Sequence, residues 1–403
     1  MGKPAAGGAC VAHLNDGRVA FVRHSIPGER VLARITEEAR SFVRADAITI
    51  LDRASARVHP PCRHSGPGGC GGCDFQHVAP RLQREIKAAL VTEQLRRLAD
   101  LDWELTVEAV PGDENGLAWR TRARYAVLPQ GRLGFRRYRS HEVHLVDSCP
   151  IAGPAIRRLA PEKMSWRGAA EVEVFAPLAG GELTVSVESQ RGRRPQVPRF
   201  DGGLVIDGRV VREPSELQLT VGGNRFVVGG GVFWQIHVGA PRVLGDALCS
   251  AADLQAGESA ADLYAGVGLF TALLADAAGS TGHVMAVEHD LRAADEAYRN
   301  MASWPNVDVI CEPVTPELVA RELGRTNVVV LDPPRQGAGK QVTAALGALE
   351  AVRRIVYVAC DAATFARDLR VLLDCGWVLT ALRAFDLFPM TEHVELMATI
   401  ERI

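Results

Sequence analysis

The C-terminal part of the chain alternates short apolar runs with amphipathic stretches. The runs Val329–Leu331 and Val356–Ala359 are rich in valine, and each predicts a short buried strand. Two earlier runs, 259–264 and 282–288, are separated by a helical pattern over 269–278. Strand and helix patterns alternate in this way from about residue 236 to the end. This alternation predicts a parallel, doubly wound sheet of the Rossmann type.

The N-terminal part has a different pattern, in which short apolar segments follow one another with turn residues between them. Residues 17–22, 30–36 and 47–51 predict strands, and several short strands so close together favour a small β-barrel. An amphipathic helix is expected over 79–101, and the alternating runs of 105–228 predict a mostly β segment. We therefore expect a multidomain α/β protein. The expected domains are a β-barrel at 1–57, a central domain at 58–235 and a Rossmann-like domain at 236–403.

Charge is unevenly distributed along the 403 residues, although the formal net charge is only −2. Residues 1–200 carry 30 Lys and Arg against 22 Asp and Glu, whereas residues 201–403 carry 16 against 26. An arginine-rich half suggests contact with a polyanion, and ordinary variation of surface charge is the alternative. No apolar run reaches the roughly 18 residues of a membrane span, and the N-terminus lacks the apolar core of a signal peptide. We expect a cytoplasmic protein without a membrane partner.

A glycine turn with the sequence Asp-Leu-Tyr-Ala-Gly-Val-Gly occupies residues 262–268. Gly266 and Gly268 would let the backbone approach a ligand, although packing glycines occur in any α/β protein. Glu288 ends the next predicted strand, where an acidic side chain usually holds ribose hydroxyls. The third glycine of a nicotinamide-binding turn is absent, and Asp332-Pro-Pro follows a buried strand. These features favour S-adenosylmethionine, which has no pyrophosphate for a third glycine to accommodate.

Two residues near the C-terminus suggest covalent catalysis. Cys360 ends a predicted strand beside the expected cofactor cleft, and Glu395 precedes the last predicted strand. Methylation of carbon 5 of uracil needs a nucleophile that attacks carbon 6 and a base that removes the carbon 5 proton. Taken alone, Cys360 would be a buried structural thiol and Glu395 a solvated carboxylate. Their context favours the roles of nucleophile and base.

The spacing Cys62-x7-Cys70-x2-Cys73 is typical of a metal site, since thiols two residues apart can bind one centre. A fourth ligand is needed, and Cys149, which precedes a proline, is the best candidate because Cys-Pro is common at iron–sulfur sites. Zinc, with His64 or His77 as its fourth ligand, is the rival interpretation. An iron–sulfur cluster is favoured over zinc. Its expected role is structural or RNA-shaping, because no flavin or nicotinamide site is evident.

The chain resembles, over nearly its whole length, the RNA uracil-5-methyltransferases that carry an N-terminal TRAM domain and a 4Fe–4S cluster. The resemblance implies that residues 1–57 form a TRAM barrel, an RNA-binding module similar to the oligonucleotide-binding fold. It implies cofactor contacts at Gln235 in Phe233-Trp234-Gln235, and at Tyr264, Glu288 and Asp332. It also implies Cys360 as nucleophile, Glu395 as base, and Cys62, Cys70, Cys73 and Cys149 as cluster ligands.

The chain departs from the family pattern at three places, one of which is the first cysteine spacing, Cys62-x7-Cys70, which is longer than in some members. Cys360 is followed by Asp361-Ala362 where the family often has Asn-Pro, and Leu269 stands where the family often has Asn. The favoured reading is a monomeric enzyme that methylates uridine in RNA, with ribosomal RNA favoured over transfer RNA. A methyltransferase that acts on an amine or a protein without a covalent adduct is one alternative. An RNA-binding iron–sulfur protein without catalytic activity is the other.

Overall fold

The computed structural model describes residues 1–177 and 182–402. The chain forms two compact units, each assembled from segments that are distant in sequence. The first comprises Met1–Leu90, Asp113–Pro214 and Phe388–His393, and the second comprises Val91–Gly112, Ser215–Leu387 and Val394–Ile403. Among the described residues, no helix is both long and apolar enough to cross a membrane.

The N-terminal strands of the first unit form a five-stranded sheet with the order β1-β2-β3-β5-β4. Its strands are β1 (Pro4–Ala5), β2 (Ala9–His13), β3 (Val19–Arg23), β4 (Arg30–Glu38) and β5 (Phe42–Asp52). Alternate residues of β3 and β5, among them Val22 and Val43, form its small core. The three strands expected from the sequence are present, and β1 and β2 were missed because they are short and glycine-flanked.

A seven-stranded sheet makes up most of the rest of the first unit, with the order β13-β12-β11-β10-β7-β8-β9. Its strands are β7 (Arg122–Val127), β8 (Leu133–Arg136), β9 (Val143–Leu145), β10 (Ala169–Phe175), β11 (Thr184–Ser189), β12 (Gly203–Ile206) and β13 (Arg209–Arg212). Helix α2 (Pro154–Leu159) and a short 3-10 turn (Pro161–Lys163) follow β9. Trp166 and Tyr125 are fully buried in the core of this sheet.

The second unit is built on an eight-stranded sheet with the order β18-β17-β16-β19-β20-β22-β21-β6. The strands are β6 (Val107–Ala109), β16 (Ser259–Leu263), β17 (His283–Val287), β18 (Val307–Ile310), β19 (Val328–Leu331), β20 (Arg354–Ala359), β21 (Trp377–Asp386) and β22 (Glu395–Arg402). The strands from β16 to β20 are mutually parallel, which confirms the doubly wound sheet. The sequence did not reveal that β22 runs antiparallel to both of its neighbours.

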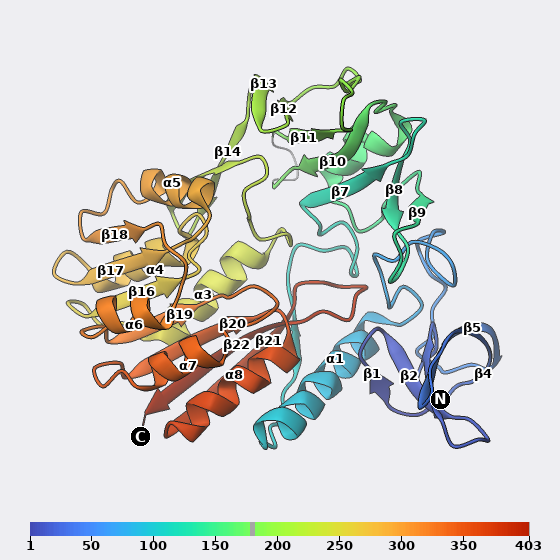
Figure 1. Ribbon diagram of the computed structural model, residues 1–403, viewed down its shortest axis with the longest axis horizontal. Helices are drawn as coiled ribbons and strands as arrows, with labels where there is room; N and C mark the ends of the chain where they lie inside the picture. Colours follow the sequence, from blue (N-terminus) through green and yellow to red (C-terminus); the bar gives the residue numbers. More distant parts are fainter. Residues whose placement is uncertain (178–181, 403) are drawn as a thin grey trace. The chain divides into compact units, whose positions relative to one another are not determined.

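Helices cover this sheet in two groups, as Figure 1 shows. Helix α3 packs with α4, and α6, α7 and α8 pack in sequence with one another. The helices of the unit are α3 (Ala240–Ala252), α4 (Leu269–Ala278), α5 (Leu291–Asn300), α6 (Pro316–Glu322), α7 (Lys340–Gly347) and α8 (Ala362–Asp374). Because helices shield both faces, all four residues of β19 are buried, as expected for a central parallel strand.

Two remaining elements complete the chain. The hairpin β14 (Glu216–Val221) and β15 (Asn224–Gly229) precedes α3. The helix expected over 79–101 is present as α1 (Pro80–Gln94), which continues into a π-helical turn, Leu95–Ala99. Asp100 then adopts a left-handed backbone conformation, with a φ of 56°, and ends the helix.

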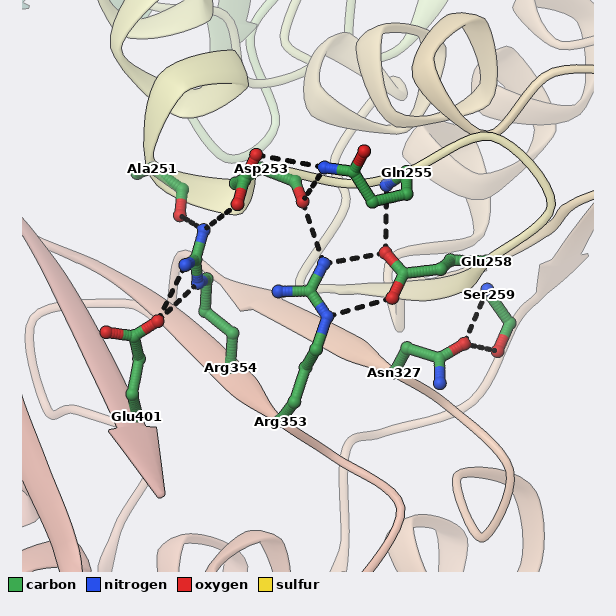
Figure 2. Close-up of polar contacts among 9 residues, drawn as sticks. All are labelled: Ala251, Asp253, Gln255, Glu258, Ser259, Asn327, Arg353, Arg354 and Glu401. Carbon is green, nitrogen blue, oxygen red and sulfur yellow. Dashed lines mark hydrogen bonds and ion pairs between the residues drawn. The ribbon is translucent and has the colours of Figure 1, made fainter. Parts of the chain in front are cut away.

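An arginine network fixes the amino-terminal ends of the central strands (Figure 2). Arg353 donates to both carboxylate oxygens of Glu258, at 2.8 and 2.6 Å, and to the carbonyl oxygen of Asp253 at 2.7 Å. Arg354 donates to Glu401 at 2.6 Å and so ties β20 to the end of β22. The bidentate Arg353–Glu258 pair and the Arg354–Glu401 pair hold the start of the sheet, at the edge opposite to the carboxyl ends of the parallel strands.

We expect Arg353→Met to lower the free energy of unfolding by about 1 kcal/mol, because the pair with Glu258 is bidentate but partly exposed to solvent. The measurement is the midpoint of urea unfolding with an unchanged slope. Arg299→Met is the matched control, because Arg299 also pairs with a glutamate, Glu216, but at a more exposed position. An effect of Arg353→Met no larger than that of Arg299→Met would contradict this account.

Candidate active site

The carboxyl ends of four adjacent parallel strands carry most of the predicted cofactor and catalytic residues. Tyr264 follows β16, Glu288 follows β17, Asp332 follows β19 and Cys360 follows β20. Parallel strands place their carboxyl ends at one edge, so these four positions lie side by side along that edge. Ligands of open α/β sheets bind at this edge, close to the point where the strand order reverses, which here lies between β16 and β19.

The glycine turn after β16 contains three residues with a left-handed backbone, a conformation that glycine adopts without steric cost and other residues seldom adopt. Gly266 and Gly268 have φ values of 56° and 89°, and Tyr264 is also left-handed at 65°. The amide of Gly266 donates to Glu288 at 2.9 Å, and the amide of Asp290 donates to the other carboxylate oxygen at 2.7 Å. Open space lies beside Gly266, because a Cβ built there would meet no heavy atom within 4 Å. The turn and the fixed Glu288 carboxylate therefore fit an adenosyl cofactor.

Asp262 is a buried acidic residue of this region that the sequence reasoning did not single out. It lies on β16, where one carboxylate oxygen accepts a bond from the Thr271 hydroxyl at 2.6 Å and the other has no hydrogen-bond partner. Burial raises the pKa of Asp262 to about 7, and the charges of Asp332 and Glu288 add to the shift. The signal was available, since Asp262 is a charged residue inside an otherwise apolar strand.

Asp332 opens a loop that is fastened at both ends. Burial raises the pKa of Asp332 to about 7, and its amide donates to the carbonyl oxygen of Leu263 at 3.3 Å. At the far end of the loop, the amides of Ala338 and Gly339 donate to one oxygen of Asp368, at 2.8 and 3.2 Å. Asp368, which the sequence reasoning also missed, thus holds the loop from helix α8.

Cys360 lies between the end of β20 and the start of α8. Asp361 is the N-cap of α8, and its carboxylate accepts the amide of Thr364 at 2.9 Å. The Asp361-Ala362 departure from the family pattern therefore supplies a conventional helix start. Burial and the carboxylates of Glu395 and Asp332 raise the pKa of the Cys360 thiol to about 12, whereas Arg335 opposes the shift. The positive end of the α8 dipole also favours the thiolate.

Glu395 reaches the same edge by a different route. It is the first residue of β22, and because β22 is antiparallel its amino end lies where the parallel strands end. Leu396 pairs with Ala359 in an antiparallel register. The next positions on the two strands, Cys360 and Glu395, therefore lie opposite each other. Glu395 is 5% exposed, and burial and the charge of Asp332 raise its pKa well above the ordinary value. The structure thus brings together a thiol and a protonatable carboxyl.

Unlike the other predicted cofactor residues, Gln235 does not follow a strand of the parallel sheet. It lies in the connection between β15 and α3. Its neighbour Trp234 is buried against Phe226 of β15, with ring centroids 5.8 Å apart, whereas Phe233 is 61% exposed. The anchored tryptophan fixes the backbone of this segment. A cofactor contact by Gln235 stays a prediction.

The four predicted cluster cysteines lie in the first unit, where they line one cavity of about 30 Å³. Burial raises the pKa of Cys149 to about 11 and raises those of Cys70 and Cys73, and neighbouring cysteine charges add to all three shifts. These shifts favour neutral thiols, so the cysteines would bind a cluster only as thiolates beside its positive charge. Within the described residues, however, no group of three or more His, Cys, Asp or Glu side chains is placed to hold a metal ion.

The two histidines considered as zinc ligands have other partners. His64 lines the same cavity, but its ring nitrogens lie 2.7 Å from an oxygen of Asp147 and 3.2 Å from the ring of His144. His77 is buried beside the carbonyl oxygen of Ser25 and does not line the cavity. Neither arrangement favours the zinc interpretation.

Two family models match the chain. Residues 3–48 match the TRAM domain, and residues 321–403 match the tRNA (uracil-5-)-methyltransferase family. An uncharacterized RNA methyltransferase of Streptomyces avermitilis is 42% identical over the whole chain and 97% of the relative. A 23S rRNA (uracil(1939)-C(5))-methyltransferase of Acinetobacter baylyi is 31% identical over 96% of this chain and 90% of the relative.

A solved structure has a similar fold. The tRNA (uracil-54, C5)-methyltransferase of Pyrococcus abyssi, in complex with S-adenosyl-L-homocysteine, matches with a TM-score of 0.72 at 23% identity. The match covers 97% of this chain and 99% of that one. It confirms the expected fold class, with a TRAM domain, a strand-rich middle and a Rossmann-like domain.

We expect Cys360 in the ligand-free protein to react slowly with iodoacetamide at neutral pH. Its raised pKa means that the thiolate fraction keeps increasing up to about pH 12, so alkylation of Cys360 should still accelerate above pH 9. Peptide mass spectrometry follows each site, and the exposed Cys375 is the internal control. Glu395→Gln should shift the Cys360 profile to lower pH by removing a repelling charge. A plateau below pH 8 would show that the helix dipole dominates instead.

Proposed function

Because the chain belongs to the RNA uracil-5-methyltransferase family, we propose that it transfers a methyl group from S-adenosylmethionine to carbon 5 of a uridine in ribosomal RNA. The observation that carries the proposal is the pairing of Ala359 with Leu396. This pairing sets the Cys360 thiol and the Glu395 carboxyl at the ends of two neighbouring strands. The covalent route needs both groups, whereas a methyltransferase acting on an amine needs no thiol.

In the proposed reaction, Cys360 acts as a nucleophile and Glu395 as a base. The thiolate sulfur forms a bond to carbon 6 of the uracil, and the electron pair of the 5,6 double bond moves onto carbon 5 and the carbonyl at position 4. S-adenosylmethionine supplies the methyl group that carbon 5 then takes up. The Glu395 carboxylate removes the carbon 5 proton, the double bond re-forms, and the sulfur leaves carbon 6. The raised pKa of Glu395 suits a base that must hold this proton.

The cofactor is proposed to contact Gln235, Tyr264, Gly266, Gly268, Glu288 and Asp332. Glu288 is already oriented by two backbone amides. A carboxylate held in this way can accept hydrogen bonds from ribose hydroxyls without reorganising. Asp332 is oriented by the loop that Asp368 fastens. Tyr264, Glu288 and Asp332 each directly follow a strand of the parallel sheet, a rigid base that suits a site that must position a methyl donor.

Ribosomal RNA is proposed over transfer RNA because of the near-complete match to the relative from Acinetobacter baylyi, which is named for 23S rRNA. We further propose that residues 1–57 and 58–235 supply most of the RNA contacts and that residues 236–403 hold the cofactor. The arginine-rich composition of residues 1–200 supports this division. The protein is proposed to act as a cytoplasmic monomer.

A 4Fe–4S cluster is proposed to be held by Cys62, Cys70, Cys73 and Cys149. The shared cavity of these thiols supports it, and a cluster that neutralises four thiolates would join the loop at residues 62–73 to the segment after β9. Its role in this proposal is structural, since a covalent methyl transfer needs no electron from it.

A stable protein–RNA adduct should form when the enzyme and S-adenosylmethionine are mixed with RNA containing 5-fluorouridine, because fluorine cannot leave carbon 5 as a proton does. Full-length 23S rRNA and bulk tRNA, each transcribed with 5-fluorouridine, are the two substrates, and denaturing electrophoresis detects the adduct. We expect the adduct with the 23S transcript and none with Cys360→Ala. If the wild-type protein formed no adduct, the covalent route would be overturned. An adduct with tRNA alone would contradict ribosomal RNA as the substrate.

The Glu395→Gln variant separates the base from the nucleophile in the same assay. With ordinary uridine RNA it should accumulate a methylated adduct, and turnover should fall at least a hundredfold, in the range of roughly 10²–10⁴ that general bases contribute. Cys375→Ala removes an exposed thiol and serves as the control for cysteine loss. Unchanged turnover in Glu395→Gln would reject Glu395 as the base.

Protein purified without oxygen should contain iron and sulfide in equal amounts and absorb visible light. Cys73→Ser should lose both the iron and the absorbance, because Cys73 lines the shared cavity. Cys249→Ser, at an exposed position outside the cavity, is the matched control. Zinc in place of iron in the anaerobic protein would contradict the cluster proposal.

A further inference from the structure

A groove of about 510 Å³ lies wholly within the first unit, far along the chain from the residues of the active site. Its walls are the strands β3 to β5, the glycine-rich stretch Gly66–Cys70, and the turn between β8 and β9 at residues 137–142. The volume falls in the range of roughly 300–1,000 Å³ that small-ligand sites have. The sequence reasoning assigned no role to the turn at 137–142.

The groove has a fixed cation and aromatic ring at its base. The guanidinium of Arg23 lies 3.5 Å from the centroid of the Tyr138 ring. Arg23 is held there because it donates to the carbonyl oxygen of Gly7 and to Asp74, each at 3.0 Å. The Tyr138 backbone is held as well, since a side chain at Gly71 would collide with it and the amide of Gly71 donates to Arg136. The platform is therefore rigid before any ligand binds.

Within the described residues, two charged groups that line the groove, Arg139 and Asp46, form no pair with an opposite charge. Arg44 pairs with Glu37 at 3.0 Å and Arg137 pairs with Glu142 at 3.6 Å, while the ring of His24, 3.8 Å from Asp46, is neutral because burial lowers its pKa to about 3. Arg139 also lines the groove, is exposed, and lies 5.6 Å from the Tyr138 ring. Because Arg139 forms no ion pair with a described residue, an anion in the groove could pair with its guanidinium without displacing a carboxylate.

We propose that this groove binds unpaired nucleotides of the RNA substrate, with Arg139 at a phosphate and the Tyr138–Arg23 pair beside a base. Grooves that combine cations with aromatic rings are typical of single-strand binding, because every base can stack on a ring or a guanidinium plane. Stacking on the ring or the guanidinium needs an exposed base face, which a paired base in a duplex does not offer, so the proposed occupant is single-stranded. The inference rests on the proposed function, since it names a subsite for the same substrate.

The test uses the full-length protein, purified without oxygen, and two fluorescent probes, a short oligouridylate and an RNA duplex of matched length. Arg139→Gln should weaken oligouridylate binding about fivefold and reduce the salt slope of its affinity by about 0.7, one phosphate contact of a single strand. Arg139→Lys should keep most of the affinity. Arg242→Gln, at an exposed position of helix α3 outside the residues proposed to contact RNA, is the matched control and should change neither value.

Tyr138→Leu and Tyr138→Phe test the ring separately from the charge. The leucine variant should weaken oligouridylate binding at least fivefold, whereas the phenylalanine variant should bind like the wild type. Duplex binding should be unchanged in every variant. The proposal that the groove binds unpaired nucleotides would be overturned if Arg139→Gln and Tyr138→Leu left oligouridylate binding unchanged. It would also be overturned if these variants lost duplex binding to the same extent.

Methyl transfer to uridine and nucleotide binding in the groove are tested by different measurements, so one proposal can be wrong while the other holds. Oligouridylate binding requires no methyl transfer, so a wild-type protein that forms no adduct with 5-fluorouridine RNA leaves the groove measurements intact. With the substrate itself, the groove variants should raise KM for RNA about fivefold while kcat at saturating RNA changes less than twofold. A fall in kcat without a rise in KM would place the residues outside substrate binding.

Discussion

The direction of the strands in one sheet is the constraint on which the candidate site depends. Parallel strands β16, β17, β19 and β20 deliver their carboxyl ends to a single edge, and each is followed there by a polar residue. Strand β22 is antiparallel, so its amino end reaches the same edge with Glu395. A strand of the opposite direction would carry Glu395 to the far edge, where the arginine network closes the sheet.

This convergence places several acidic groups close together. Asp262 and Glu395 are buried and Asp332 is half-buried, the pKa values of all three carboxyls are raised, and the pKa of the nearby Cys360 thiol is raised as well, although Arg335 opposes the shifts of Cys360 and Glu395. Buried like charges repel, so the groups favour their neutral forms. A sulfonium cofactor bound at this edge would add a positive charge to that of Arg335 and would favour the ionised forms of these groups.

The first unit shows the same dependence on neighbours from different parts of the chain. Three cysteines come from one loop and the fourth lies before α2, yet all four line one cavity. Cys70 lines both this cavity and the groove of Arg139. The glycine-rich loop therefore joins two features that are separate in sequence, and Gly71 is required there because the hairpin backbone lies against it.

The sequence by itself determined what local pattern can encode. The valine runs of β19 and β20 predicted buried strands, the left-handed turn at Gly266 and Gly268 was readable from glycine spacing, and the cysteine spacing grouped Cys62, Cys70 and Cys73. Only the tertiary structure decided the antiparallel course of β22, the loop contact of Asp368, the orphaned oxygen of Asp262 and the meeting of Arg23 with Tyr138. Each of these depends on pairing or packing between residues that are distant in the chain, and hydrophobic periodicity records burial but not the partner.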